Sequence, residues 1–206
     1  MRRFGISFKQ RMMADRAAAL RPALKTAALL LCFSFHPLHS TAQQAHPTES
    51  QVKAAYLYNF GKFVRWQSPP SGSDSFDICV LGKNPFGSAL ASTVAGEKLD
   101  GKNIRVRNVF SLPDATHCRI LFISSSEENR LKPIVAVAKQ SNLLTVSDIP
   151  GFAQRGGMIE LVHLEDKIRF QVNAGAISDA GLTVSSELLK VAVKVIGTNQ
   201  AREIAK

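Results

Sequence analysis

Short apolar runs alternate with segments of helical periodicity along most of this 206-residue chain, and this rhythm constrains its fold more than any other feature. Residues 119–124 are almost entirely apolar, which is typical of a strand buried on both faces of a sheet. Residues 104–109 alternate apolar and polar side chains, which predicts a strand with one face in water. Further strands are predicted at 77–82 and 143–148, and helices at 86–94 and 125–140. This order predicts an α/β fold, a single layered domain with a mostly parallel central sheet flanked by helices.

The last third of the chain follows a different pattern. Residues 158–164 and 167–173 are two predicted strands, separated only by Glu165 and Asp166. Strands this close in sequence form an antiparallel hairpin, so we expect a C-terminal β-hairpin at one side of the sheet. A final helix is predicted over 188–196, between a capping serine and a terminating glycine.

The first helix is predicted over about 49–66. Thr48 and Gln51 have the spacing of a capping box, and the apolar residues that follow recur with helical periodicity. The segment is also the most aromatic part of the chain, with Tyr56, Tyr58, Phe60, Phe63 and Trp66. We expect these rings to belong to the core; a partner-binding surface is the alternative explanation.

The N-terminus has the layout of a secretory signal. A basic stretch precedes ten mainly apolar residues at 26–35, and Ser40 and Ala42 place small side chains before a cleavage point. Ten residues are too few to span about 30 Å of hydrocarbon, which needs roughly 20. We therefore expect a signal peptide at 1–42 and a periplasmic mature chain, rather than an uncleaved membrane anchor. The basic region is long for a signal, which leaves Met12 and Met13 as alternative starts to Met1.

The net charge of +10 lies mostly in this leader. Residues 1–42 carry +6, so the remaining chain carries only +4. A nearly balanced body argues against a phosphate-binding surface, so no nucleic-acid partner is expected. No repeat or linker interrupts the mature sequence, and we expect one domain over 43–206 with its core at about 49–196.

Two cysteines remain once the leader is removed, Cys79 and Cys118. In an oxidising compartment such a pair is expected to form one disulfide, and two buried thiols are the alternative. Cys79 lies in the first strand of the α/β pattern and Cys118 immediately precedes the third. These strands are neighbours in a doubly wound order, so their Cα atoms can approach within about 4.4–6.8 Å.

The segment from Leu81 to Ser88 lies where a phosphate-binding loop would lie, after a strand and before a helix. A phosphate loop requires Gly-Lys-Ser or Gly-Lys-Thr at its end, whereas Gly87 is followed here by Ser88 and Ala89. Pro85 also removes one backbone donor. The sequence therefore excludes a nucleoside-triphosphate site, and a bound anion at the helix start is a weaker alternative.

The remaining polar residues support no catalytic mechanism. His46, His117 and His163 have no metal-ligand spacing to another histidine, cysteine or acid. The serines at 124–126 lack a nucleophile-elbow pattern, and the acidic pairs lie at a helix start and at a turn, where solvent and the helix dipole account for them. We expect no catalytic residue, no metal and no cofactor, and thus no enzyme.

Seven segments together resemble the YfiR/HmsC family of periplasmic proteins. They are Lys53–Trp66, Ile78–Gly82 with Pro85–Gly87, His117–Ile123, Leu144–Asp148, Gly156–Ile159, Arg169–Asn173, and Gly181–Leu182 followed by Ser185–Lys190. Each motif is weak alone, but their order behind a secretion signal is specific. The resemblance covers about residues 49–196, nearly the whole mature chain.

The resemblance implies a regulator that represses an inner-membrane diguanylate cyclase of the YfiN type by binding its periplasmic sensing domain. Cyclic di-GMP, and with it exopolysaccharide and biofilm formation, would then stay low. It also implies that an outer-membrane lipoprotein of the YfiB type can sequester the repressor. The cysteine pair of the family matches Cys79 and Cys118. A homodimer is compatible with the sequence, which does not determine the oligomeric state.

The resemblance also suggests a partner-binding segment. The family's functional surface includes a Phe-x-Ile/Val-Asn motif, which corresponds here to Phe170–Asn173 and the residues up to Ile177. Strand alternation places Phe170 and Val172 on one face and Gln171 and Asn173 on the other. We expect the apolar pair to be buried and Gln171, Asn173 and Ile177 to meet the partner. Many relatives carry Glu where this chain has Gln171, which puts any charge-based contact there in doubt.

The main alternative is a periplasmic small-molecule-binding domain that feeds a histidine kinase or transporter. Such sheets bind ligands at the carboxyl ends of their strands, which predicts a pocket near residues 82–87 and 124–126. A hydrolase lacks candidate residues. A neighbouring cyclase gene would favour the repressor, and a neighbouring kinase or porin gene the sensor.

Overall fold

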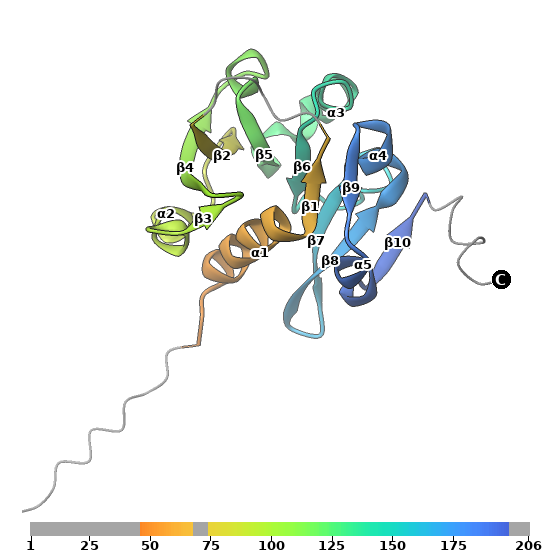
Figure 1. Ribbon diagram of the computed structural model, residues 1–206. Coiled ribbons are helices and arrows are strands. Elements are labelled where there is room, and N and C mark those ends of the chain that lie inside the picture. Colours follow the sequence, from red (N-terminus) through yellow and green to blue (C-terminus); the bar gives the residue numbers. More distant parts are fainter. Residues whose placement is uncertain (1–45, 68–73, 198–206) are drawn as a thin grey trace, which may run out of the picture. The chain divides into compact units, whose positions relative to one another are not determined.

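The computed structural model describes residues 46–67 and 74–197, so the predicted signal peptide lies outside the described residues. An eight-stranded sheet, in the order β10-β8-β7-β6-β5-β2-β4-β3, forms its centre (Figure 1). Strands β4, β2, β5, β6 and β7 are parallel, and β8 returns antiparallel to β7, as predicted. The strands are β2 (Ser75–Leu81), β3 (Lys98–Leu99), β4 (Lys102–Val109), β5 (Cys118–Ile123), β6 (Leu144–Ser147), β7 (Ile159–Leu164), β8 (Lys167–Asn173) and β10 (Lys194–Ile196).

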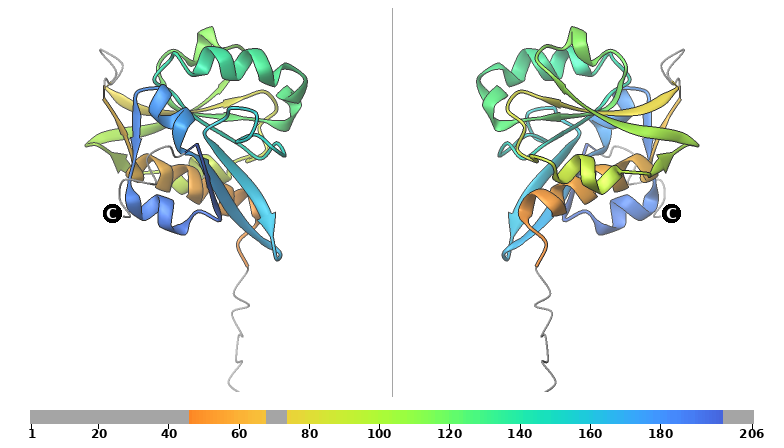
Figure 2. Two further views of the ribbon diagram at one scale, coloured as in Figure 1. Left: turned by 90° about the vertical axis from the view of Figure 1, so that its right-hand side faces the viewer. Right: turned by 90° about the vertical axis from the view of Figure 1, so that its left-hand side faces the viewer.

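Helices cover both faces of this sheet (Figure 2). Helices α1 (Glu49–Phe63), α2 (Ala89–Val94), α4 (Ala174–Asp179) and α5 (Ser186–Val191) contribute to one apolar cluster, which includes Phe60, Phe122 and Phe170. Helix α3 (Leu131–Ala138) packs in a second cluster with Leu121 and Phe152. The predicted fold class, a mostly parallel α/β sheet with a C-terminal hairpin and a final helix, is confirmed.

The predicted capping box opens α1. The Oγ1 of Thr48 accepts a hydrogen bond from the N–H of Gln51 at 3.3 Å, and Oε1 of Gln51 accepts one from the N–H of Thr48 at 2.7 Å. The helix ends at Phe63, however, three residues earlier than predicted. Val64–Trp66 form strand β1, which pairs antiparallel with β9 (Leu182–Val184) in a separate small sheet. Strand β9 lies far from β1 in the sequence, and the pairing of the two strands overrides the helical periodicity of residues 64–66.

The final helix is also shorter than predicted. It spans Ser186–Val191, and β10 at Lys194–Ile196 takes the place of its last turn. Valines at alternate positions favour an extended chain, and β10 gains a ladder of backbone hydrogen bonds by pairing in parallel with the end of β8. The first part of the helix predicted over 125–140 is a 3₁₀ segment, Ser125–Arg130, and a second 3₁₀ segment, Pro113–Ala115, was not predicted.

The aromatic side chains of the first helix are mainly part of the core, as expected. Phe60 is fully buried, and its ring lies 5.2 Å from that of Phe170 in an edge-to-face contact. Tyr56 contacts both of these rings, and its hydroxyl donates to the carbonyl of Ile168 at 3.0 Å. Phe63 is the exception, with 36% of its side chain exposed.

A disulfide joins Cys79 of β2 to Cys118 of β5, with the Cα atoms 5.9 Å apart. Both cysteines are buried in the cluster that includes α3. The predicted pairing is therefore confirmed, and its geometric reason holds, because β2 and β5 are adjacent parallel strands.

A β-bulge follows Cys118. Asp77 lies opposite Cys118 while Ile78 lies opposite Ile120, so Arg119 is the extra residue of β5. A bulge redirects the side chain that it inserts. The guanidinium of Arg119 is consequently buried, with its Cζ 5.8 Å from the ring centres of both Trp66 and Phe76. Its Nε and the indole Nε1 of Trp66 have no hydrogen-bond partner in the part of the chain that the structure describes.

Candidate functional site

Strand β8 carries the segment that the sequence assigned to partner binding. Phe170 and Val172 are buried, as predicted from strand alternation, and Lys167 and Arg169 are exposed. Gln171 is half-buried, because its neighbours on both sides are paired strands: Glu160 of β7 and Lys194 of β10. Its Oε1 accepts a hydrogen bond from Nε2 of Gln154 at 3.0 Å. The polar face of β8 is therefore formed by Lys167, Arg169 and Gln171, with Gln154 beside it.

Asn173 has a structural role that the sequence pattern did not indicate. It is the N-cap of α4, where its Oδ1 accepts a hydrogen bond from the N–H of Ala176 at 2.9 Å. Its Nδ2 donates to the carbonyl of Ala153, also at 2.9 Å. The expectation that this side chain is free for a partner is therefore wrong, since both ends of the amide are already bonded within the protein.

Ile177 is buried, with 1% of its surface exposed, so its predicted exposure is also wrong. The chain after Asn173 turns into helix α4, whose first turn this asparagine caps. Helical periodicity then directs Ile177 and Ala180 into the core cluster. Of the three predicted contact residues, only Gln171 presents part of its side chain at an outer face without a capping role.

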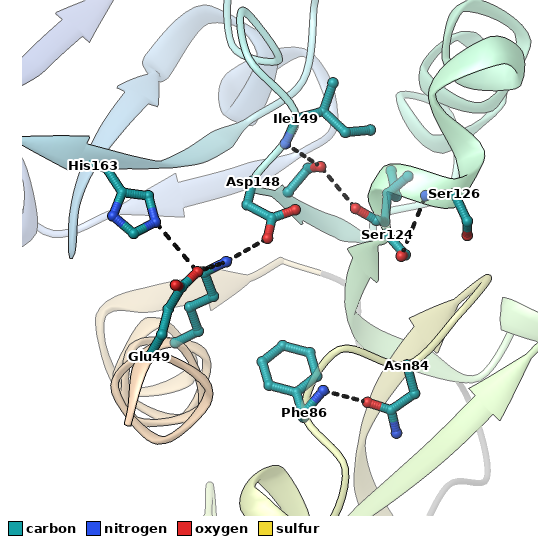
Figure 3. A network of polar contacts seen from close by, with 11 residues as sticks. Glu49, Asn84, Phe86, Ser124, Ser126, Asp148, Ile149 and His163 are labelled. Atoms are coloured by element: carbon teal, nitrogen blue, oxygen red, sulfur yellow. Dashed lines mark hydrogen bonds and ion pairs between the residues drawn. The ribbon is translucent and has the colours of Figure 1, made fainter. Parts of the chain in front are cut away.

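A polar network lies at the carboxyl ends of the parallel strands (Figure 3). Nζ of Lys53, on α1, lies 2.5 Å from Oδ2 of Asp148, just after β6, and 2.5 Å from Oε1 of Glu49. Nε2 of His163, on β7, lies 3.2 Å from the same Glu49 oxygen. The network thus connects the first turns of α1 to the end of β6, in the middle of the sheet, and to β7 of the hairpin.

Electrostatics within this network favour the charged forms of Lys53 and Glu49. Burial lowers the pKa of Lys53, but the hydrogen bonds and charges of Asp148 and Glu49 outweigh burial and leave that pKa raised. The hydrogen bond from Lys53 is the main cause of a lowered pKa at Glu49, and His163 adds to it. The sequence did not indicate this group, because Lys53 and Asp148 are 95 residues apart.

A pocket of about 310 Å³ lies where β2 and β5 end, and it is lined by Lys83, Asn84, Pro85 and the three serines 124–126. This is the place where the sensor hypothesis put a ligand. The polar groups of the lining are partly used within the protein: the N–H of Lys83 donates to Oγ of Ser126 at 2.9 Å, and the N–H of Phe86 donates to Oδ1 of Asn84 at 2.8 Å. Gly82 has a φ of +86°, and a Cβ there would lie 2.4 Å from Oγ of Ser126, so the turn requires glycine.

Within residues 46–67 and 74–197, no group of three or more histidine, cysteine or acidic side chains is placed to hold a metal ion. Over the same residues, no helix has the length and apolar composition needed to cross a bilayer. What the geometry offers is a disulfide-linked α/β domain with a polar strand face, a small pocket and an ion-pair network around the buried Lys53.

Such a domain is a candidate binding and regulatory module. The chain belongs to the YfiR/HmsC-like family, whose model matches residues 50–193. This family is one of periplasmic regulators of the cyclic di-GMP pathway.

Two solved structures are similar to parts of this chain. A conserved domain protein from Vibrio cholerae O1 biovar El Tor is 11% identical, with a TM-score of 0.50 over 72% of this chain and 60% of the other. The ABC domain from Streptococcus pneumoniae in complex with L-Trp is 12% identical, with a TM-score of 0.45 over 59% of this chain and 55% of the other. The chain thus spans at most 60% of either structure. Comparison with curated proteins gives no significant match.

Proposed function

We propose that this protein represses an inner-membrane diguanylate cyclase of the YfiN type by binding its periplasmic sensing domain. Cyclic di-GMP and the biofilm and exopolysaccharide output that depends on it are then held low. The observation that carries the proposal is the family match over residues 50–193, which begins in the first turn of α1 and continues past the end of α5. The mature protein acts from the periplasm after cleavage of the predicted signal at 1–42.

Repression of this kind is a shift in the population of receptor states. The repressor must bind the inactive form of the cyclase more tightly than the active form, since equal affinity for both would change nothing. A lipoprotein of the YfiB type relieves repression by competing for the repressor. A homodimer of the repressor is compatible with both steps.

The polar face of β8 is the proposed contact with the cyclase. Gln171 lies at one end of this face, with the exposed Arg169 next to it on β8, Lys194 of β10 opposite it in register and Gln154 hydrogen-bonded beside it. A neutral amide flanked by cations fits a partner surface that supplies hydrogen-bond acceptors and acidic groups. Asn173 and Ile177 support this face from within the fold by capping and packing α4.

Deleting the gene and measuring cellular cyclic di-GMP tests the proposal. The level is expected to rise in the deletion strain and to return when the wild-type gene is supplied. Supplying Gln171→Lys instead, with the periplasmic amount of protein measured alongside, is expected to leave the level high. An unchanged level in the deletion strain would refute repression itself, whereas full repression by a folded Gln171→Lys protein would move the contact elsewhere.

A second candidate is a small-molecule sensor, which the pocket beside Lys83, Asn84 and the serines 124–126 favours. Its position at the carboxyl ends of β2 and β5 is where open α/β sheets bind ligands. A thermal-shift screen of periplasmic metabolites tests this candidate with Ser126→Tyr as the control, because a large side chain there is expected to fill the pocket. A ligand that raises the melting temperature of the wild type but not of the variant would support the sensor.

A further inference from the structure

The two edges of strand β4 differ in how much of their backbone is paired with another strand. Its inner edge pairs with β2 from Asn103 to Val109, whereas β3 covers the outer edge only at Lys102 and Asn103. From Ile104 onward no strand lies beside the outer edge in the part of the chain that the structure describes, and β4 lies near the end of the strand order (Figure 1). The opposite edge of the sheet is formed by β10, which is only three residues long.

The direction of the backbone hydrogen bonds identifies which N–H and C=O groups of β4 face away from β2. The N–H of Ile104 donates to the carbonyl of Glu97 at 3.4 Å, so it points toward the outer edge. Backbone groups of alternate residues in a strand point to the same side. The N–H and C=O groups of Val106 and Asn108 therefore face outward, whereas those of Val109 face β2, where its carbonyl accepts from Gly82.

The side chains of this edge specify what could pair with it. On one face Arg105 and Arg107 hold exposed guanidinium groups, 62% and 42% exposed, above the buried Asp77. On the other face Ile104 and Val106 are half-buried against the core. A second copy of the same edge would bring arginine against arginine, which is unfavourable. An extended segment with acidic and apolar residues at alternate positions would match both faces.

An apolar pocket of about 260 Å³ follows the end of β4, between the loop at Phe110–Pro113 and helix α3. Phe110 is 79% exposed and Val137, on α3, is 51% exposed. Natural proteins usually shorten or cover long open edges because such edges recruit other strands. Here the open edge is instead continuous with exposed apolar side chains.

We propose that the outer edge of β4 binds an extended, acidic segment of a partner protein by β-strand addition. The backbone of that segment pairs with Val106 and Asn108, its acidic side chains meet Arg105 and Arg107, and its apolar side chains cover Ile104 and Val106 on the other face. The inference does not depend on the proposed function, because any partner with such a segment would fit.

Binding of a short capped peptide that alternates valine and glutamate to the mature, disulfide-linked protein tests this proposal. A peptide with lysine in place of glutamate is the control, and we expect it to bind at least about tenfold more weakly, because two favourable cross-strand charge pairs become unfavourable. Arg107→Gln is expected to weaken the glutamate peptide about threefold, while Lys132→Gln, on the exposed side of α3, leaves its affinity unchanged.

Val106→Pro is the decisive variant, because proline removes an N–H that points away from β2 and leaves the inner ladder complete. We expect it to abolish peptide binding. If the variant does not fold, amide exchange of the wild type decides: the Val106 and Asn108 amides are expected to gain protection when the glutamate peptide is added. Absence of binding, equal binding of the two peptides, or protection that does not change at Val106 would overturn the proposal.

Discussion

Nζ of Lys53 lies 2.5 Å from Oδ2 of Asp148, so a buried cation on the first helix is paired with a carboxylate at the carboxyl end of strand β6. The two residues are 95 positions apart, and Glu49 completes the pairing from one turn earlier on α1. The contact fixes the start of α1 over the sheet, next to the hairpin that carries β8.

Lys53→Met is expected to destabilise the protein. It leaves the two carboxylates without their cation, and because Asp148 and Glu49 retain access to water the cost is about 1–3 kcal/mol rather than the larger cost of a fully buried pair. Denaturant unfolding measures this difference, with Lys132→Met as a surface control expected to change stability by less than about 0.5 kcal/mol. Equal stability of Lys53→Met and the wild type would show that the pair contributes nothing net.

Arg119→Met, in contrast to Lys53→Met, is expected to keep or raise the stability of the protein. Burial lowers the pKa of Arg119, and the charge of Asp100 opposes this only in part. Its Nε has no hydrogen-bond partner in the described part of the chain, so methionine removes a desolvated cation and keeps the apolar contact with Trp66 and Phe76. We expect a free energy of unfolding equal to that of the wild type or higher by about 1–2 kcal/mol. A loss above about 2 kcal/mol would mean that the cation–π contacts outweigh desolvation.

The disulfide gives a prediction about expression as well as stability. Cys79→Ser is expected to cost about 2–5 kcal/mol and to lower the amount of periplasmic protein, since the bond closes a loop between residues 39 positions apart. The native protein should show no titratable thiol until it is both denatured and reduced, because both cysteines are buried and bonded. Two reactive thiols before reduction would contradict the bond.

Stability should fall in acid because of Asp77. Burial raises the pKa of this carboxyl, but the hydrogen bonds of Ser75 and Arg105 and the charges of Arg105 and Arg107 lower it by more. A depressed pKa stabilises the folded state above the unfolded-state value of about 3.9, and this stabilisation is lost as pH falls through the folded-state value. The difference in unfolding free energy between the wild type and Asp77→Asn should therefore be large at pH 7 and shrink below about pH 4. A difference that is constant with pH would assign the effect to packing.

Sequence patterns predicted those parts of the fold that depend on interactions between residues close together in the chain. The apolar runs of β2 and β5, the capping box at Thr48 and the hairpin at Glu165–Asp166 are each specified within a few residues. In that hairpin both turn residues have positive φ, 50° and 57°, as a two-residue turn of type I′ requires.

The elements that sequence analysis missed depend on distant partners. Strands β1 and β10 contain three residues each, and they are stable as strands only because β9 and β8 lie beside them. The Lys53–Asp148 pair likewise has no local spacing that could predict it. Helix α4 was not predicted although the predicted strand already ended at Asn173, because its six residues are too few to show helical periodicity.

The buried position of Ile177 changes which mutations can distinguish a loss of partner binding from a loss of folding. Ile177 is buried beside Ala180, so Ile177→Glu is expected to place an unpaired charge in the core and to lower the amount of folded protein. Phe170→Ala should act similarly, with a loss of about 3–5 kcal/mol through a cavity. Gln171→Lys, on the polar face of β8, should instead keep the stability within about 0.5 kcal/mol of the wild type while derepressing cyclic di-GMP. Thermal unfolding of the three purified variants, beside cyclic di-GMP in complemented deletion strains, distinguishes these outcomes. Normal stability of Ile177→Glu together with lost repression would restore an exposed role for Ile177 and contradict its buried position.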